Sequence, residues 1–326
     1  MPAVVRNTAR AAALCLTLAL AAACASGNPN REPAAAIPTP TPLGELPWTD
    51  AFKSPRFVAV AADGAVLVTY ASTGRMFVFA SDGRIVRRIG PRGPDGGAFG
   101  DPAGVAVAPN GEVYVVDEFE NRAHRFTAEG APIGSWGAQG DGPGQFSSPA
   151  GIAVDAAGAV YVSDSGNARV QKFEADGAFI AAWETEPVGG RRFDAPMGIA
   201  SDRAGHVYVA DFARHNVQKL TTGGELVDVL GVKGSAGGQF DSPIGVAVAP
   251  WGDVYIVDSV NRRVQRFDAS GAFLGSWGGG GSRPGDFRSP SGVAVGPSGS
   301  VFVTDLSNHR VDRFTLDGDF APNWGG

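Results

Sequence analysis

The sequence predicts an all-β protein, a closed six-bladed β-propeller with four antiparallel strands in each blade. A 47-residue unit repeats six times from Phe52 to the C-terminus without a change in spacing. The chain also contains 47 glycines and 23 prolines among 326 residues, which indicates many tight turns, and its 44% hydrophobic residues suffice for a large core. A period of this length is typical of repeat architectures, and the six copies leave no room for a second domain.

Two markers define the repeat. An aspartate closes the second strand of five copies, where the first copy has Tyr70, and a Phe stands three residues before a Pro in all six. The aspartates are Asp117, Asp164, Asp211, Asp258 and Asp305, and the pairs are Phe52/Pro55, Phe99/Pro102, Phe146/Pro149, Phe193/Pro196, Phe240/Pro243 and Phe287/Pro290. A residue that every copy carries builds the repeat, so functional residues are expected where the copies differ.

The N-terminal residues predict an export signal. Arg6 and Arg10 precede a short apolar stretch, too short for a membrane-spanning helix, that ends just before Cys24. This junction resembles a bacterial lipobox, whose cysteine becomes lipidated, although Ala21 stands where that pattern usually has Leu. Ordinary cleavage after an Ala-x-Ala site is the alternative. We expect a signal peptide at 1–23, a lipid anchor and Pro-rich tether at 24–47, and the propeller at 48–326.

The net charge and the predicted export limit the kinds of partner that the protein can bind. The net charge is −6, and it becomes −8 when residues 1–23 are removed. An acidic body is a poor nucleic-acid binder, because that affinity depends on cations that meet phosphates. The mature chain would retain at most Cys24, so no internal disulfide is expected. In lipoproteins of two-membraned bacteria, an Asp directly after the lipidated cysteine marks retention in the inner membrane. This chain has Ala25 at that position, which favours the outer membrane in such a cell.

Each repeat divides into four strands at its turn signals. In the copy that begins at Phe146, Gly151–Val154 and Val160–Asp164 are apolar at odd and even positions, as in strands covered on both faces. Arg169–Phe173 then alternates polar and apolar residues, and Ala178–Trp183 forms the outer strand. A single meander of this kind leaves its faces uncovered, so the blades must stack on one another.

Radial stacking into a ring explains the aligned apolar residues better than an open solenoid, which normally has polar capping repeats. One aligned ring consists of Phe79, Phe126, Phe173, Leu220, Phe267 and Phe314, and another of Ile89, Trp136, Trp183, Leu230, Trp277 and Trp324. Gly325 and Gly326 follow the last outer strand directly, so the final blade is expected to be complete from its own repeat. Leu43–Trp48 is expected to pack over the seam and to anchor the tether through Trp48.

The third strands carry a specific resemblance. The segments NARVQKF (167–173), NRRVQRF (261–267) and NHRVDRF (308–314), each after a VYVVD-like strand, resemble the NHL repeat over Phe52 to Gly326. The resemblance implies a six-bladed β-propeller that most often serves as a binding platform, with a minority of lyases and hydrolases. Family resemblance predicts the fold far better than the task.

The repeated aspartates are interpreted as structural. An Asp at this place is expected to accept backbone N–H groups of the turn that follows, and an Arg five residues later can hold its carboxylate. These arginines are Arg75, Arg122, Arg169, Arg263 and Arg310. An active site would require nearly identical sites around the whole ring, so we interpret the pairs as clips within or between blades.

Residues that break the pattern are the candidates for binding a ligand. The loops that lead into the first strands and the turns between second and third strands should share one face. The candidates there are Arg56, Tyr70, Arg92, Glu118, Phe119, Glu120, Arg191, Arg192, Phe212, Arg214, His215, Arg262 and Arg283. Exposed aromatics beside charges are typical of recognition surfaces, whereas free variation of loops is the alternative explanation.

The sequence contains few residues in patterns that indicate catalysis or metal binding. The position between Pro and Gly of each repeat should meet the channel mouth, and it holds Arg56, Ala103, Ala150, Met197, Ile244 and Ser291, none of which is a good metal ligand. The four histidines (His124, His206, His215 and His309) do not predict a three-histidine zinc site like that of the peptidyl-amidating lyases. We therefore expect no cofactor and no metal. A calcium site built from acids such as Asp95, Glu118 or Asp286 is the second hypothesis.

The sequence thus favours a non-catalytic, exported, monomeric scaffold that binds a protein, peptide or glycan in the cell envelope. The alternative is a metal-assisted (Ca or Zn) lyase or lactonase that acts at the channel mouth. A third interpretation is a purely architectural envelope protein.

Overall fold

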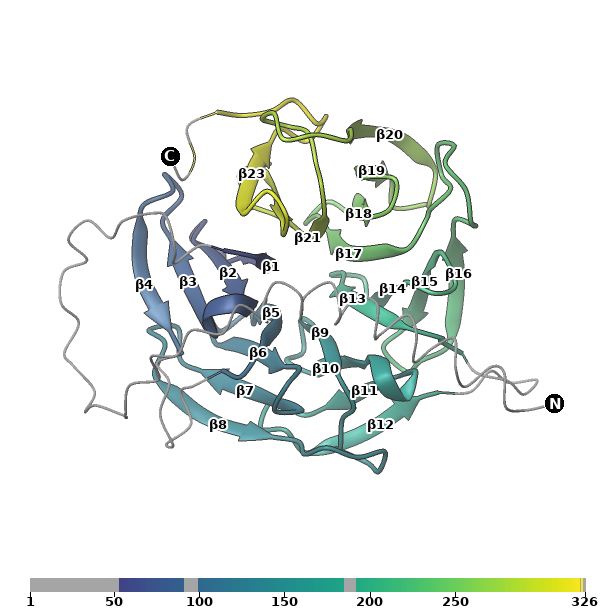
Figure 1. Cartoon of the computed structure of the whole chain (residues 1–326). Helices are drawn as coiled ribbons and strands as arrows, with labels where there is room; N and C mark the ends of the chain where they lie inside the picture. Colours follow the sequence, from purple (N-terminus) through teal and green to yellow (C-terminus); the bar gives the residue numbers. More distant parts are fainter. Residues whose placement is uncertain (1–52, 91–98, 185–191, 323, 325–326) are drawn as a thin grey trace.

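The computed structural model describes residues 53–90, 99–184, 192–322 and 324. These residues form six antiparallel sheets arranged around a central axis, which confirms the predicted all-β six-bladed propeller (Figure 1). Two single-turn 3-10 helices, η1 (Ala71–Thr73) and η2 (Ser165–Asn167), follow second strands. Within the described part of the chain, none of the helices is long and apolar enough to cross a membrane. The expected signal, Cys24, the tether and Trp48 lie outside the described residues.

Five sheets have four strands in sequential order, and the sixth has three. Blade one comprises β1 (Pro55–Val60), β2 (Val66–Tyr70), β3 (Arg75–Phe79) and β4 (Ile85–Ile89); blade two β5 (Pro102–Val107), β6 (Val113–Asp117), β7 (Arg122–Phe126) and β8 (Pro132–Trp136); blade three β9 (Pro149–Val154), β10 (Val160–Asp164), β11 (Arg169–Phe173) and β12 (Phe179–Trp183). Blade four comprises β13 (Pro196–Ser201), β14 (His206–Asp211), β15 (Asn216–Thr221) and β16 (Leu226–Leu230); blade five β17 (Pro243–Val248), β18 (Val254–Asp258), β19 (Arg263–Phe267) and β20 (Phe273–Gly278); blade six β21 (Pro290–Val295), β22 (Val301–Asp305) and β23 (Arg310–Phe314).

The first strand of each blade lies nearest the axis, and the fourth strand forms the rim (Figure 1). In blades two to six a glycine follows the Pro-x pair, and it explains how closely the inner strands approach. A Cβ atom added to Gly104 would lie 2.8 Å from the Cα of Gly151, and one added to Gly292 would lie 2.8 Å from the Cα of Phe57. A side chain at either of these two glycines would collide with the neighbouring backbone. The central cavity that remains measures about 40 Å³, enough for a few water molecules.

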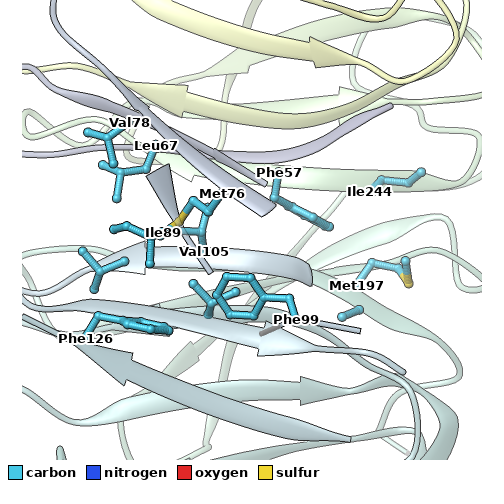
Figure 2. Close-up of a cluster of buried hydrophobic side chains, with 13 residues drawn as sticks. Phe57, Leu67, Met76, Val78, Ile89, Phe99, Val105, Phe126, Met197 and Ile244 are labelled. Atoms are coloured by element: carbon cyan, nitrogen blue, oxygen red, sulfur yellow. The ribbon is translucent and has the colours of Figure 1, made fainter. Parts of the chain in front are cut away.

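The core lies between the blades. Figure 2 shows one cluster, in which Leu67 and Met76 of blade one pack near Val105 and Phe126 of blade two, with Met197 further along the same cluster. Aromatic rings repeat this packing around the propeller: the ring of Trp136 lies 5.8 Å from that of Phe173 in the next blade. Each sheet is therefore covered on both faces, as the double-sided apolar pattern of its inner strands predicts.

The sixth blade differs from the prediction. Among the described residues its fourth strand is reduced to an isolated bridge between Phe314 and Phe320. Pro322 falls in this segment and has no N–H to donate, so it interrupts the ladder. Trp324 nevertheless reaches the seam, with its ring 5.0 Å from Phe302 of blade six and 5.3 Å from Phe79 of blade one. The segment beside β23 thus comes from the same repeat, as expected, although its described residues form no regular strand, and its tryptophan packs at the ring closure.

Candidate functional site

The repeated aspartates join two loops on what we call the upper face, formed by the loops leading into first strands and the turns after second strands. The carboxylate of Asp117 accepts the backbone N–H groups of Gly100, Asp101 (3.0 Å) and Glu120 (2.9 Å). Asp211 likewise accepts N–H groups of its leading loop and of its own turn. Burial raises the pKa of Asp164 and of Asp211. Each carboxylate therefore links the leading loop to the turn after the second strand and fixes the position of that turn.

The arginines five residues later behave differently from blade to blade. The Nε of Arg169 donates to Asp164 at 2.8 Å, and that of Arg263 donates to Asp258 at 2.7 Å. Arg310 pairs instead with Asp312, at 2.9 Å. Arg122 of blade two is exposed and lies 3.5 Å from the Oγ of Ser135. The Asp–Arg clip thus holds in blades three and five, within one blade, and is replaced in blades two and six.

Arg56 ties blade one to blade two. Its side chain is 3% exposed, its Nη2 donates to the Glu118 carboxylate, and its Nη1 lies 3.3 Å from Asp101 Oδ1. Burial alone would lower the pKa of Arg56, and the two carboxylates raise it overall. Burial raises the pKa of Asp101. Arg56 and Glu118 therefore brace the blade-two turn rather than present free charges.

The braced turn presents one aromatic side chain to solvent. Phe119 is 77% exposed, and its ring lies beside Gly100, where an added Cβ atom would come within 2.8 Å of it. The N–H of Glu118 donates to Asp101 O at 3.0 Å, and the Nδ2 of Asn121 donates to Phe119 O at 3.3 Å. A fixed backbone thus carries a largely exposed phenyl ring on the upper face.

The blade-four candidates lie in two different environments. Phe212 is half-buried and packs against the cluster that contains Met197 and Ile244 at the channel mouth. Arg192 is only 5% exposed, so its side chain belongs to the interior. Sequence position alone placed both residues on the binding face; of the two, only Phe212 is partly accessible there.

The turn after β14 is polar and held by its neighbours. The Nε of Arg214 lies 3.3 Å from Asp194 and 3.9 Å from Asp211. His215, with φ +55°, accepts the N–H of Ser242 on Nδ1 at 3.0 Å. Both side chains link loops of adjacent strands or blades while they remain partly accessible.

The remaining candidate residues differ in how far their side chains are exposed. Tyr70 is 3% exposed in the core, 5.4 Å from the ring of Phe77, and burial raises its pKa; it contributes no exposed group to the upper face. Arg262 and Arg283 are exposed on blades five and six. Arg92 and Arg191, and the acid Asp95, lie outside the described residues. The side chains at the channel mouth are all buried: Arg56, Ala103, Ala150, Met197, Ile244 and Ser291.

One histidine was overlooked at the level of sequence. The structure places His124 on β7, with its side chain 3% exposed and its Nε2 atom 3.8 Å from Glu120 Oε2. The signal that could have found it is an alignment of the repeats. Blades three, four and five have glutamine at this position (Gln171, Gln218 and Gln265), and blades three, five and six have asparagine where blade two has Glu120.

Five stretches of the chain match a known repeat. The NHL repeat matches residues 99–126, 146–173, 193–220, 240–267 and 287–314. The chain carries NHL repeats. Each match runs from the Phe before the first strand to the aligned apolar residue of the third strand, which is Leu220 in blade four and a Phe in the other four matches. The first copy is not among the matches, and it is the copy with Arg56, Phe57 and Tyr70 in place of the usual small residue, Gly and Asp.

Solved structures share the fold of this NHL-repeat protein at low identity. A streptogramin B lyase structure has a TM-score of 0.60 and 16% identity over 82% of each chain. Virginiamycin B lyase from Staphylococcus aureus has a TM-score of 0.59 and 17% identity over 84% of this chain and 85% of that one. A chain of a nidogen/laminin complex has a TM-score of 0.60 and 18% identity over 80% and 93%. None of the curated proteins compared with the chain matches it in sequence.

Proposed function

We propose that this NHL-repeat propeller is a non-catalytic binding protein that holds a protein, peptide or glycan partner on its upper face. The observation that carries the proposal is Phe119, whose side chain is 77% exposed on a turn braced by Arg56 and Asp117. Large aromatic side chains on pre-organised backbone are the usual anchors of protein interfaces, because they bury much area at little entropic cost. The neighbouring Glu120, which is exposed, adds charge selectivity to this anchor.

The size of the central cavity supports a surface partner over a small substrate. Pockets that bind small molecules usually enclose about 300–1,000 Å³, whereas the cavity at the centre of this propeller measures about 40 Å³. The six side chains at the channel mouth include neither a histidine nor a carboxylate. The similar lyase structures, at 16–17% identity, speak for a common fold alone.

We also propose where in the cell the protein lies. An export signal that ends before Cys24 would leave a lipid-anchored, monomeric propeller in the cell envelope, held off the membrane by the Pro-rich segment at 25–42. An acidic body on such a tether can meet envelope partners and repels nucleic acids.

The experiment is a crosslinking capture from intact cells that express wild-type protein, Phe119→Ser or Trp251→Ser, with captured molecules identified by mass spectrometry. Trp251 is the matched control: it is 45% exposed, and it lies in the turn between β17 and β18, at the other end of its blade from the upper face. We expect one partner that is lost with Phe119→Ser and retained with Trp251→Ser. Equal capture by wild type and Phe119→Ser, or no capture by any form, would contradict the proposal.

A further inference from the structure

In blade three, three side chains donate to the repeated aspartate. The Oδ2 atom of Asp164 accepts from Asn167 Nδ2 (2.8 Å), Arg169 Nε (2.8 Å) and Gln171 Nε2 (3.1 Å). Blade five repeats the arrangement at Asp258, with Asn261 (2.9 Å), Arg263 (2.7 Å) and Gln265 (3.0 Å). Three donors around one buried carboxylate oxygen satisfy it fully.

Blade two has replaced this donor set. At the three corresponding positions it has Glu120, Arg122 and His124, and Arg122 is exposed beside Ser135 rather than paired with Asp117. Among the described residues the only hydrogen bond to Asp117 Oδ2 is that of the Gly100 N–H. Two amide donors have thus become a carboxylate and an imidazole, both of which can be electron-pair donors.

The imidazole of His124 is buried beside aromatic side chains. Its side chain is 3% exposed, and neither ring nitrogen has a hydrogen-bond partner among the described residues. Its ring lies edge-on to Phe99 at 5.5 Å and stacks near Phe126 at 6.4 Å, so the surrounding aromatics fix its orientation. Buried polar nitrogen atoms normally have a hydrogen-bond partner, so the two ring nitrogens of His124 suggest a place where a ligand binds.

The three side chains converge on one point. One donor atom each from Asp117, Glu120 and His124 lies within 4.8 Å of the other two. Backbone N–H groups hold Asp117 in place, as outer-sphere hydrogen bonds hold metal-ligating carboxylates. Glu120 is exposed, so it can rotate toward the other two and leaves a route from solvent.

We propose that Asp117, Glu120 and His124 form a binding site for a divalent transition-metal ion, with Zn²⁺ as the representative ion. One imidazole nitrogen and two carboxylates suit zinc and its neighbours, with solvent at the remaining position, whereas calcium prefers an all-oxygen shell. The ion takes the place of the donors that Asp164 and Asp258 receive in their blades. It also cross-links the turn that carries Phe119 to strand β7.

The test measures Zn²⁺ binding by isothermal titration calorimetry on the purified full-length protein after removal of metal with a chelator. The variants His124→Gln and Glu120→Asn install residues that other blades already carry at these positions. His206→Gln is the control, because His206 also lies on a strand beside a carboxylate, with Nδ1 2.9 Å from Asp202. We expect one site in wild type and in the control, and at least about a tenfold loss of affinity in each of the other two variants.

Thermal unfolding with and without Zn²⁺ provides a second readout, because a ligand that binds only the folded state raises Tm. We expect the rise in wild type and in His206→Gln, and not in His124→Gln or Glu120→Asn. Glu120→Asn changes an exposed side chain, so it keeps the test valid if His124→Gln folds poorly. Absence of a stoichiometric site in wild type, or unchanged affinity in both cluster variants, would overturn the proposal.

Discussion

The hydroxyl of Thr304 donates a 2.9 Å hydrogen bond to the backbone carbonyl of Arg56, and so ties the last blade to the first. Ser291 donates to the same carbonyl at 2.7 Å. Between blades one and two, Thr69 makes the corresponding bond to the carbonyl of Ala103, also at 2.7 Å. The seam between the two ends of the chain therefore uses the same buried bridge as an ordinary junction between consecutive blades.

Replacing Thr304 by Val should weaken the seam. Val116 and Val257 occupy the corresponding positions of blades two and five, so the new methyl group fits. We expect the free energy of unfolding to fall by about 1–3 kcal/mol, because the bond to Arg56 is lost and the buried N–H of Gly292, which donates to Thr304 Oγ1 at 2.7 Å, is left without its acceptor. Urea unfolding measures this value, with the exposed Ser298→Ala as control. A loss no larger than that of the control would show that the bridge does not stabilise the seam.

Replacing Trp324 by Ala should loosen the same seam through packing. Its ring contacts Phe302 and Phe79 as the ring of Trp277 contacts Phe314 in the next blade, at 5.9 Å. Full burial of a tryptophan contributes about 3–5 kcal/mol, and Trp324 is half-buried, so we expect a loss of about 2 kcal/mol. Chemical unfolding of Trp324→Ala and of Trp251→Ala, an exposed ring outside any seam, gives the comparison. Equal stability of the two variants would contradict this role.

The repeat period of the sequence predicts most of the fold, but it does not predict how the last blade closes against the first. The predicted strands Val160–Asp164 and Arg169–Phe173 coincide with β10 and β11, because their turn signals and apolar runs are local features. The outer segment of blade six departs from the other repeats among its described residues, because Pro322 replaces a residue with an N–H, and alignment with the other repeats does not reveal this effect. A local substitution in one copy overrides the consensus of the other five.

The inner glycines can be tested with a matched pair. An added Cβ at Gly104 would lie 2.8 Å from the Cα of Gly151, whereas one at Gly134, on the outer strand β8, meets nothing within 4 Å. We expect Gly104→Ala to lower the free energy of unfolding by about 1–3 kcal/mol through overpacking, and Gly134→Ala to change it by less than about 0.5 kcal/mol. Thermal and urea unfolding measure both. Equal effects would mean that the inner strands can separate at no cost.

The candidate site was only partly predictable. Arg56 and Tyr70 were recognised as departures from the repeat, but their burial depends on neighbours that sequence spacing does not reveal, such as Glu118 beside Arg56. His124 was overlooked because a single histidine on a strand carries no signal by itself. Its relation to Glu120 becomes visible only when each blade is compared with the donor set of blades three and five.

Replacing Asp312 by Gln should stabilise the protein at neutral pH. Asp312 is 5% exposed, at the position where blade three has Gln171. Burial raises the pKa of Asp312, against Arg310, and the nearby Asp305 raises it further. A glutamine there can donate to Asp305 as Gln171 donates to Asp164, at 3.1 Å. We expect the free energy of unfolding at pH 7 to rise by about 1 kcal/mol.

The sign of the pH dependence tests the cause of this effect. Because the pKa of Asp312 is higher in the folded state than in the unfolded state, the folded protein loses stability as the carboxyl ionises with rising pH. Wild type therefore regains stability relative to Asp312→Gln as the pH falls toward about 4, and the advantage of the variant shrinks. Urea unfolding of both proteins at neutral and acidic pH measures this difference. An advantage that is the same at both pH values would attribute the gain to the new hydrogen bond alone and not to removal of a buried charge.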